Sequence, residues 1–166
     1  MDGRYTVYAR TLTFLLNSEE VLLIRRSPNA QIFPGLYNGV GGHIERGEDV
    51  LSAAHREVHE ETGLDVPNLS LHCLLHVDEG TDRPGVMVFI FVGHTQERDV
   101  TDTREGTLHW TPLTRISELN LLPDLPPLLS RILARPPCTA PFFARSTILS
   151  DPDGESWEIQ FVSDSP

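Results

Sequence analysis

The hydrophobic pattern at the start of the chain predicts two strands joined by a tight turn. Residues 4–17 (RYTVYARTLTFLLN) and 21–26 (VLLIRR) are rich in β-branched, aromatic and aliphatic side chains. The polar residues 17–20 between them supply the turn. From residue 27 to residue 47 the pattern stops and Gly, Pro and Asn become frequent, which predicts a long, ordered functional loop.

An amphipathic helix is predicted over residues 49–62. Leu51, Ala54 and Val58 recur at helical spacing and form its apolar stripe. Gly63 follows immediately and favours the left-handed conformation that commonly ends a helix. The helix therefore has both an apolar face and a stop signal.

The rest of the chain returns mainly to strand patterns. Strands are predicted at 69–77, 86–94, 108–113, 141–149 and 156–162, with a Pro-interrupted helical stretch at about 116–134 and an Asp-Gly turn between the last two strands. Strands outnumber helices and the connections allow antiparallel pairing, so the α+β class is favoured. The length of 166 residues indicates one domain, residues 1–166.

Composition and charge narrow the function classes. With 39% hydrophobic and 22% charged residues, no apolar run near the roughly 20 residues of a membrane span and no signal-peptide pattern, a cytoplasmic protein without a membrane partner is expected. The net charge of -11 argues against a nucleic-acid partner. Cys73 and Cys138 fit no metal-ligand spacing and are expected to be reduced, mostly buried thiols.

Three glutamates crowd one side of the predicted helix. Glu57, Glu60 and Glu61 span an arc of about 100° beside the apolar stripe. Like charges at this spacing repel, whereas a bound Mg²⁺ or Mn²⁺ prefers carboxylate oxygens and often binds phosphates as well. The alternative is a solvated acidic face on which Arg56 pairs with Glu60.

The residues around these glutamates resemble a known motif. Residues 42–64 read Gly42-x5-Glu48-x7-Arg56-Glu57-Val58-x-Glu60-Glu61-x-Gly63-Leu64, which resembles the Nudix box of the MutT-like hydrolases with every defining position filled. The resemblance implies an αβα sandwich with a central mixed β-sheet. It also implies hydrolysis of a nucleoside diphosphate linked to another group, X, with Mg²⁺ or Mn²⁺ as cofactor.

The same resemblance assigns roles to individual residues. Glu57, Glu60 and Glu61 become metal ligands, together with the carbonyl oxygen of Gly42. Glu105, in the downstream segment REGTLHW, becomes a further ligand or the general base; an ordinary surface glutamate is the alternative. The base is one of Glu57, Glu60 and Glu105.

Other motif positions are implied to be structural. Gly41, Gly63 and the ion pair between Glu48 and Arg56 would shape the loop and tie it to the helix. At the end of the second strand, Arg25 and Arg26 point to opposite faces. The MutT-like pattern favours Arg26 as a phosphate-binding residue over a solvated strand end.

Two segments outside the motif bear on the substrate. GLYNGVGGHIERGE and LLPDLPPLL resemble the branch of the family that hydrolyses oxidised purine nucleoside triphosphates, which implies that Asn38 and Asp124 read the purine edge. Leu122 and Leu125 stand where that branch has Trp and a second Asp. The alternatives are a turn role for Asn38 and a helix N-cap role for Asp124.

The leading functional hypothesis is Mg²⁺-dependent hydrolysis of a nucleoside triphosphate to monophosphate and pyrophosphate, with 8-oxo-dGTP or a related oxidised purine nucleotide as substrate. The alternatives are hydrolysis of a dinucleoside polyphosphate, ADP-ribose or a nucleotide sugar, or an inactive nucleotide-sensing module. The expected partner is a small-molecule nucleotide, and the chain is expected to be a monomer or a homodimer.

Overall fold

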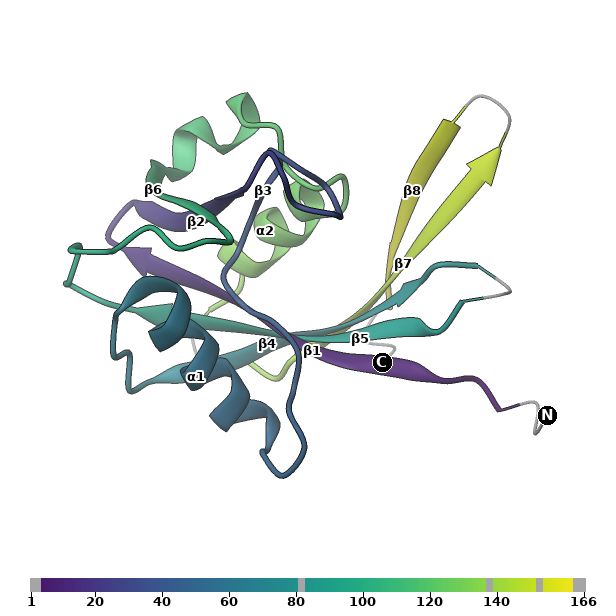
Figure 1. Ribbon diagram of the computed structural model, residues 1–166, viewed down its shortest axis with the longest axis horizontal. Coiled ribbons are helices and arrows are strands. Elements are labelled where there is room, and N and C mark those ends of the chain that lie inside the picture. The colour runs from purple at the N-terminus through teal and green to yellow at the C-terminus, as the bar shows by residue number, and fades with distance from the viewer. Residues whose placement is uncertain (1–3, 81–82, 137–138, 152–153, 163–166) are drawn as a thin grey trace.

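The computed structural model of the protein describes residues 4–80, 83–136, 139–151 and 154–162 (Figure 1). In chain order they form β1 (Val7–Asn17), β2 (Glu20–Arg26), β3 (Tyr37–Asn38), α1 (Val50–Thr62), β4 (Leu69–Asp78), β5 (Gly85–His94), β6 (Gly106–Pro112), the 3₁₀ helix η1 (Leu113–Glu118), α2 (Leu125–Leu133), β7 (Phe142–Asp151) and β8 (Gly154–Phe161). The predicted α+β class is confirmed.

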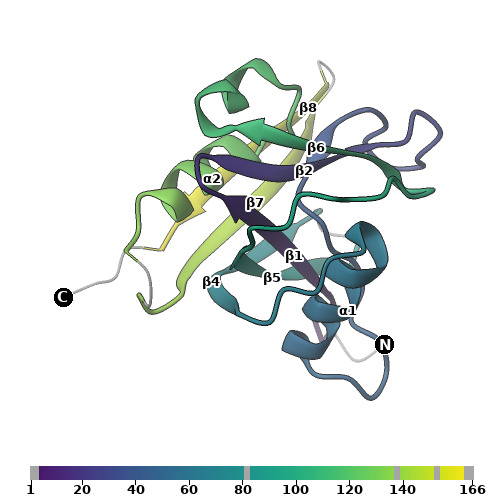
Figure 2. The ribbon, with the colours of Figure 1, turned by 90° about the vertical axis from the view of Figure 1, so that its left-hand side faces the viewer.

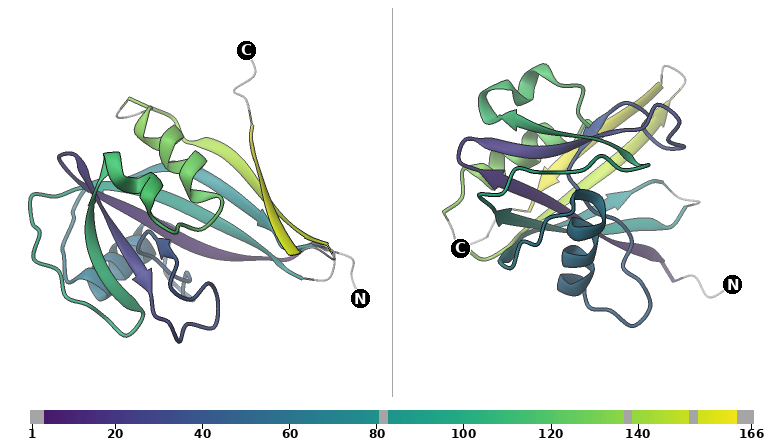
Figure 3. Two further views of the ribbon diagram at one scale, coloured as in Figure 1. Left: turned by 90° about the horizontal axis from the view of Figure 1, so that it is seen from above. Right: turned by 60° about the vertical axis from the view of Figure 1, so that its left-hand side comes forward.

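The strands form one curled, mixed sheet, seen from two sides in Figure 3. The strand order is β3-β2-β1-β5-β4-β7-β8, and β6 pairs with the other edge of β2. β1 runs parallel to β5 and β4 parallel to β7, whereas all other pairs are antiparallel. The mixed sheet implied by the motif is confirmed, and the antiparallel pairing that the connections allowed holds for only part of the sheet.

The two α-helices cover opposite faces of this sheet (Figure 2). On β1, Leu12 and Phe14 belong to the larger buried cluster, which includes Leu128 of α2. Leu15 points the other way and packs in a smaller cluster with Val58 of α1. The alternation of strand side chains thus produces the αβα arrangement. Among the described residues, no helix has the length and apolar character that crossing a membrane requires.

The site region begins where β2 separates from β1. β1 pairs with β2 only near their shared turn, while β2 pairs with β6 along its whole length. Residues 39–44 take up the free edge of β1: the Thr13 N–H donates to the Val40 carbonyl (2.7 Å) and the Thr11 N–H to the Gly42 carbonyl (2.9 Å). A Cβ atom at Gly41 would lie 2.3 Å from the Thr11 carbonyl oxygen, so glycine allows this close approach.

Three local predictions need correction or lie outside the described chain. Leu51 is 42% exposed, because it stands on the first turn of α1; Ala53 is buried there instead. The helical stretch at 116–134 divides into η1 and α2. Cys73 is buried as predicted, whereas Cys138 and the centre of the last hairpin turn lie outside the described residues.

Candidate active site

Helix α1 is capped at both ends by residues within the segment 42–64. Asp49 Oδ1 accepts the N–H groups of Leu51 (2.9 Å) and Ser52 (3.0 Å), which are otherwise unpaired at a helix start. At the other end Gly63 has φ of 77°, and its N–H donates to the His59 carbonyl (2.8 Å). The caps fix the length and direction of the helix that carries the glutamates.

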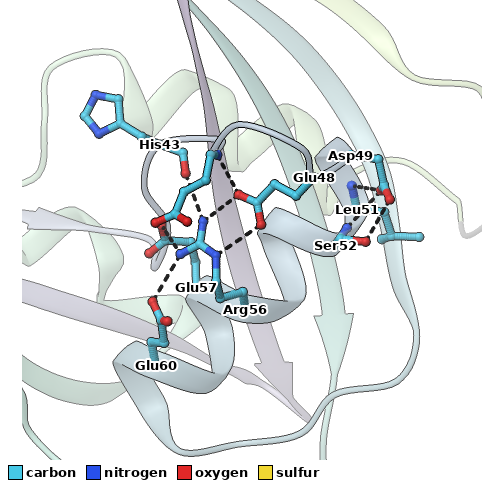
Figure 4. A network of polar contacts seen from close by, with 9 residues as sticks. His43, Glu48, Asp49, Leu51, Ser52, Arg56, Glu57 and Glu60 are labelled. Atoms are coloured by element: carbon cyan, nitrogen blue, oxygen red, sulfur yellow. Dashed lines mark hydrogen bonds and ion pairs between the residues drawn. The ribbon is translucent and has the colours of Figure 1, made fainter.

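Arg56 ties the preceding loop to α1 (Figure 4). Its guanidinium donates to both carboxylate oxygens of Glu48 (2.7 and 3.1 Å) and to the His43 carbonyl (3.0 Å). It also reaches Glu57 (3.0 Å) and Glu60 (3.1 Å). The hydrogen bond from Arg56 lowers the pKa of Glu48. The expected Glu48–Arg56 ion pair is therefore present, and so is the Arg56–Glu60 pair of the alternative interpretation.

Glu57 lies directly against the glycine loop. A Cβ atom at Gly42 would lie 2.4 Å from Glu57 Oε1, so a side chain at this position would displace the carboxylate. The Gly42 carbonyl accepts the Thr11 N–H but retains a second lone pair that a cation could use. Burial raises the pKa of Glu57, and the hydrogen bond from Arg56 opposes this rise.

Glu61 is the most enclosed of the three glutamates. It is only 5% exposed, and its Oε2 accepts the Gly41 N–H at 2.7 Å. Burial raises the pKa of Glu61, and a hydrogen bond with the Glu105 carboxyl group raises it further. The negative charge of Glu57 acts in the same direction. Two carboxyl groups from distant parts of the chain therefore meet at this point.

This donor set suits a divalent cation. Carboxylates that raise one another's pKa repel each other when both are ionised, and a bound cation stabilises them in the ionised form. In the described part of the chain, no three carboxylate, histidine or cysteine side chains already enclose a metal position. Arg56 accounts for part of this, since it holds oxygens of Glu57 and Glu60. The glutamates and the Gly42 carbonyl still offer the oxygen donors that Mg²⁺ prefers.

A cavity of about 170 Å³ opens beside the glutamates. Six of the predicted site residues meet there from separate parts of the chain: Arg26, Asn38, Gly41, Glu61, Glu105 and Asp124 all line the cavity. The other two glutamates of α1 are not among the lining residues. One of them, at position 60, has a side chain that is 58% exposed.

The predicted substrate residues are placed as follows. Asn38 lies in β3 and not in a turn, and its Oδ1 accepts the Gly39 N–H (2.9 Å). Asp124 stands at the N-cap position of α2, but its side chain makes no capping hydrogen bond. It is 6% exposed, and burial raises its pKa, although the neighbouring Ser146 hydroxyl opposes the rise. Arg26 Nε donates to the Ile32 carbonyl (2.9 Å), which fixes the loop after β2.

The cavity also contains an arginine that was not predicted from the sequence. Arg10 of β1 lines the cavity, and its guanidinium interacts with the charges of Glu57, Glu61 and Glu105. Burial is the main reason why the pKa of Arg10 is lowered. The strand alternation places Arg10 on the same face as Leu12, so a charged residue in a buried register was the signal available in the sequence.

An aromatic pair at the cavity also went unpredicted. Phe33, from the loop after β2, and Trp157, from β8, both line the cavity and pack edge to face with ring centroids 5.4 Å apart. Phe33 has φ of 50°, an uncommon conformation for a bulky residue. In Figure 1 the loop reaches toward the projecting β7–β8 hairpin. A contact between residues 124 positions apart leaves no local trace in the sequence.

Comparison with solved structures supports the fold assignment. The MutT protein from Bacillus halodurans superposes with a TM-score of 0.76 at 22% identity, covering 92% of this chain and 97% of that one. The NUDIX domain of Shewanella oneidensis NrtR, solved with ADP ribose, gives a TM-score of 0.66 at 18% identity, covering 77% of this chain and 87% of that one. These likenesses show a shared fold.

Comparison of sequences identifies the family. Mouse oxidized purine nucleoside triphosphate hydrolase is 33% identical over 116 residues, which are 69% of this chain and 72% of the mouse protein. The m7GpppN-mRNA hydrolase NUDT17 of Xenopus laevis is 47% identical over 53 residues, 32% of this chain but only 18% of the frog protein. Residues 7–135 match the family model described as NUDIX domain. The chain therefore belongs to the NUDIX family of hydrolases, pyrophosphohydrolases that act on nucleoside diphosphate derivatives.

Proposed function

We propose that this chain hydrolyses a nucleoside triphosphate to the monophosphate and pyrophosphate, with Mg²⁺ as cofactor and Mn²⁺ as a substitute. Oxidised purine nucleotides such as 8-oxo-dGTP are the candidate substrates, and the cytoplasm is the proposed location. The observation that carries the proposal is one cavity lined both by Asn38 and Asp124 and by Glu61 and Glu105. A base and a polyphosphate can thus be held next to each other.

The polar groups in the cavity suit the edge of a purine. The Asn38 amide nitrogen is a donor, while its oxygen is already used by Gly39. Burial favours the neutral form of Asp124, which can donate as well as accept a hydrogen bond. Leu122 and Leu125 also line this cavity, in place of a second set of polar contacts. We therefore expect weaker discrimination between oxidised and unmodified purines than a site with an additional carboxyl group would give.

The similarity to the mouse protein supports the choice of substrate class. That relative is named an oxidized purine nucleoside triphosphate hydrolase, and the match extends over most of both chains. The frog relative, an m7GpppN-mRNA hydrolase, matches over a shorter region. The triphosphate reading is therefore favoured over a capped or diphosphate-linked substrate.

The glutamates would hold the metal. Glu57, Glu60, Glu61 and Glu105, with the Gly42 carbonyl, are the proposed ligands; bound metal would neutralise phosphate oxygens and acidify a water molecule. Attack of water on phosphorus releases a proton to a base. Of the three base candidates Glu105 lines the cavity, which supports giving it this role. Arg10 and Arg26 add positive charge that would stabilise the departing pyrophosphate.

A nucleotide panel with two coupling enzymes tests the proposal. Phosphate that appears from a triphosphate only with inorganic pyrophosphatase would support it. Phosphate that appears from ADP-ribose or a dinucleoside polyphosphate only with alkaline phosphatase would favour the alternative class. A Glu61→Gln protein purified in parallel controls for contaminating hydrolases. Absence of turnover for every triphosphate, with nucleotide binding retained, would replace the enzyme hypothesis with a sensing module.

A further inference from the structure

A second cavity, of about 300 Å³, lies beside the first, between the end of β2 and the segment that leads into β6. It is lined by Arg25, Arg26, Ser27, Pro28, Thr103, Arg104, Gly106 and Thr107. We call it the arginine cavity. Among the residues that the structure describes, three arginines and no acidic residue line it, although the chain has 24 acidic residues and a net charge of -11. The cavity is thus a positive region in an acidic protein.

The three arginines of this cavity differ in their partners from several other arginines of the chain. Arg56, Arg98 and Arg145 each contact a carboxylate. Within the residues that the structure describes, Arg25, Arg26 and Arg104 take part in no ion pair. Guanidinium groups gathered without a counter-charge repel each other, and an anion in the cavity would relieve this repulsion.

Two of the three hydroxyl groups on the lining residues of the arginine cavity are free to donate, whereas that of Thr107 is hydrogen-bonded to His109 (2.9 Å). Ser27 Oγ accepts the Asn29 N–H (3.2 Å), and Thr103 Oγ1 accepts the Glu105 N–H (3.3 Å). Since each oxygen is the acceptor in these bonds, its own O–H hydrogen remains available. Phosphoryl oxygens act only as acceptors when ionised. Guanidinium and hydroxyl donors together therefore favour a phosphoryl group over a neutral ligand.

The arginine cavity shares a wall with the first cavity. Arg26 lines both. The Ser27 N–H donates to the Glu105 carbonyl (2.8 Å), and the Thr103 N–H donates to the Gly106 carbonyl (3.2 Å). The backbone that presents Glu105 to the first cavity therefore also forms the arginine cavity. A polyphosphate that passes Arg26 can reach from one cavity into the other.

We propose that the arginine cavity is an anion site that takes the terminal phosphoryl group of the substrate, beyond the bond that is cut. The identity of that substrate rests on the proposed function, whereas the anion site rests on the contacts of Arg25, Arg104 and their neighbours. After hydrolysis the same site would hold the outer phosphate of pyrophosphate. The cavity thus selects for chain length in the phosphate part of the substrate.

Binding of inorganic pyrophosphate in the presence of EDTA tests the site without turnover. We expect the double variant Arg25→Gln/Arg104→Gln to bind about tenfold or more weakly than wild type in calorimetric titration, because two charge-assisted contacts are lost. The double variant Arg46→Gln/Arg115→Gln removes two exposed arginines that do not line the cavity and serves as the matched control. Both replaced arginines are exposed, and equal melting temperatures would show that folding is intact.

Three results would overturn the proposal. Equal pyrophosphate affinity of wild type and double variant would show that these arginines do not form an anion site. An equal loss in Arg46→Gln/Arg115→Gln would show that the effect comes from net charge alone. Orthophosphate that binds as tightly as pyrophosphate through the same arginines would make this a site for free phosphate and not for a substrate's terminal group.

Steady-state kinetics provides a second test of the anion site. The double variant should raise KM for a nucleoside triphosphate about tenfold at unchanged kcat, and leave KM for the corresponding diphosphate unchanged. An equal rise for the diphosphate would contradict the assignment to the terminal phosphoryl group. If no triphosphate is hydrolysed by wild type, the proposed function fails while the pyrophosphate titration still decides the anion site.

Discussion

Polar groups have different contacts in the segment from Gly41 to Gly63 and in the opposite wall of the first cavity, which includes Asp124. In the segment, Arg56 contacts three carboxylates and a backbone carbonyl, and Glu61 accepts the Gly41 N–H. On the opposite wall, Asp124 is buried without a capping hydrogen bond. The wall proposed to carry the chemistry (the chemical side) is held in place by its own contacts, whereas the wall proposed to recognise the base (the recognition side) keeps polar groups available for a ligand.

The largest effect is expected from a substitution that acts on the chemical side alone. Glu61→Gln keeps an oxygen that can accept the Gly41 N–H but removes the charge proposed to hold metal. We expect kcat to fall on the order of 10²–10³-fold, comparable to the loss of a key electrostatic group. Stability should be unchanged or higher, because burial of a carboxyl group is avoided. Turnover near the wild-type rate, measured with coupled phosphate release, would contradict the metal-ligand assignment.

A smaller effect is expected when the support of the glutamates is removed. Arg56→Met leaves Glu48, Glu57 and Glu60 without their shared partner. The melting temperature should drop by several degrees, and the apparent Mg²⁺ affinity should weaken about 10–100-fold, as for other residues that orient metal ligands. Arg46→Met, from the same loop, is the control. If both variants lose equal Mg²⁺ affinity in titrations of activity, the effect is general charge loss.

On the recognition side, Trp157→Ala should act mainly on KM. Loss of the ring removes the contact with Phe33 and an aromatic surface of the first cavity. Because stacking of one base on an aromatic ring contributes about 1–3 kcal/mol, KM for nucleotides should rise about tenfold with kcat within about twofold. Trp110→Phe is the control, since Trp110 is absent from the cavity lining. A fall in kcat with unchanged KM would assign Trp157 to the chemical side.

The smallest expected effect is a pH dependence of stability. Burial raises the pKa of Asp124 in the folded protein above its unfolded value near 3.8. Its contribution is therefore fully present below that unfolded value and is lost as the pH rises through the folded pKa. Asp124→Asn cannot ionise, so it should melt about 2–4 °C above wild type at pH 8 and converge with wild type near pH 4. A difference that is constant with pH, in parallel thermal melts, would show that Asp124 does not titrate in this way.

The sequence anticipated the features that depend on neighbours along the chain. The Gly63 C-cap of α1, the Glu48–Arg56 ion pair and the first hairpin all follow from spacing within about twenty residues, whereas the N-cap role of Asp49 was not predicted. The helical periodicity was less reliable at the start of α1, where Leu51 is exposed. It also placed Glu61 beside the apolar stripe, whereas the carboxyl group is buried under the Gly41 loop.

Features that depend on distant pairing were not available from the pattern. Strand order follows from which edges meet, so the parallel pairs β1–β5 and β4–β7 have no local signal. The same holds for the position of Arg10 opposite the glutamates and for the approach of Phe33 to Trp157. The family resemblance supplied Asn38 and Asp124, but their common cavity is a finding of the three-dimensional structure.

The β7–β8 hairpin has a consequence for how such enzymes can diversify. Among the described strands, β8 lies at the end of the sheet and pairs with β7 alone, yet it brings Trp157 to the cavity. α1 belongs to another part of the chain and packs on the other face of the sheet, although its Glu61 reaches the same cavity. Changes in the length or sequence of the distal half of the hairpin would therefore alter substrate choice and leave the proposed metal-binding glutamates of α1 in place.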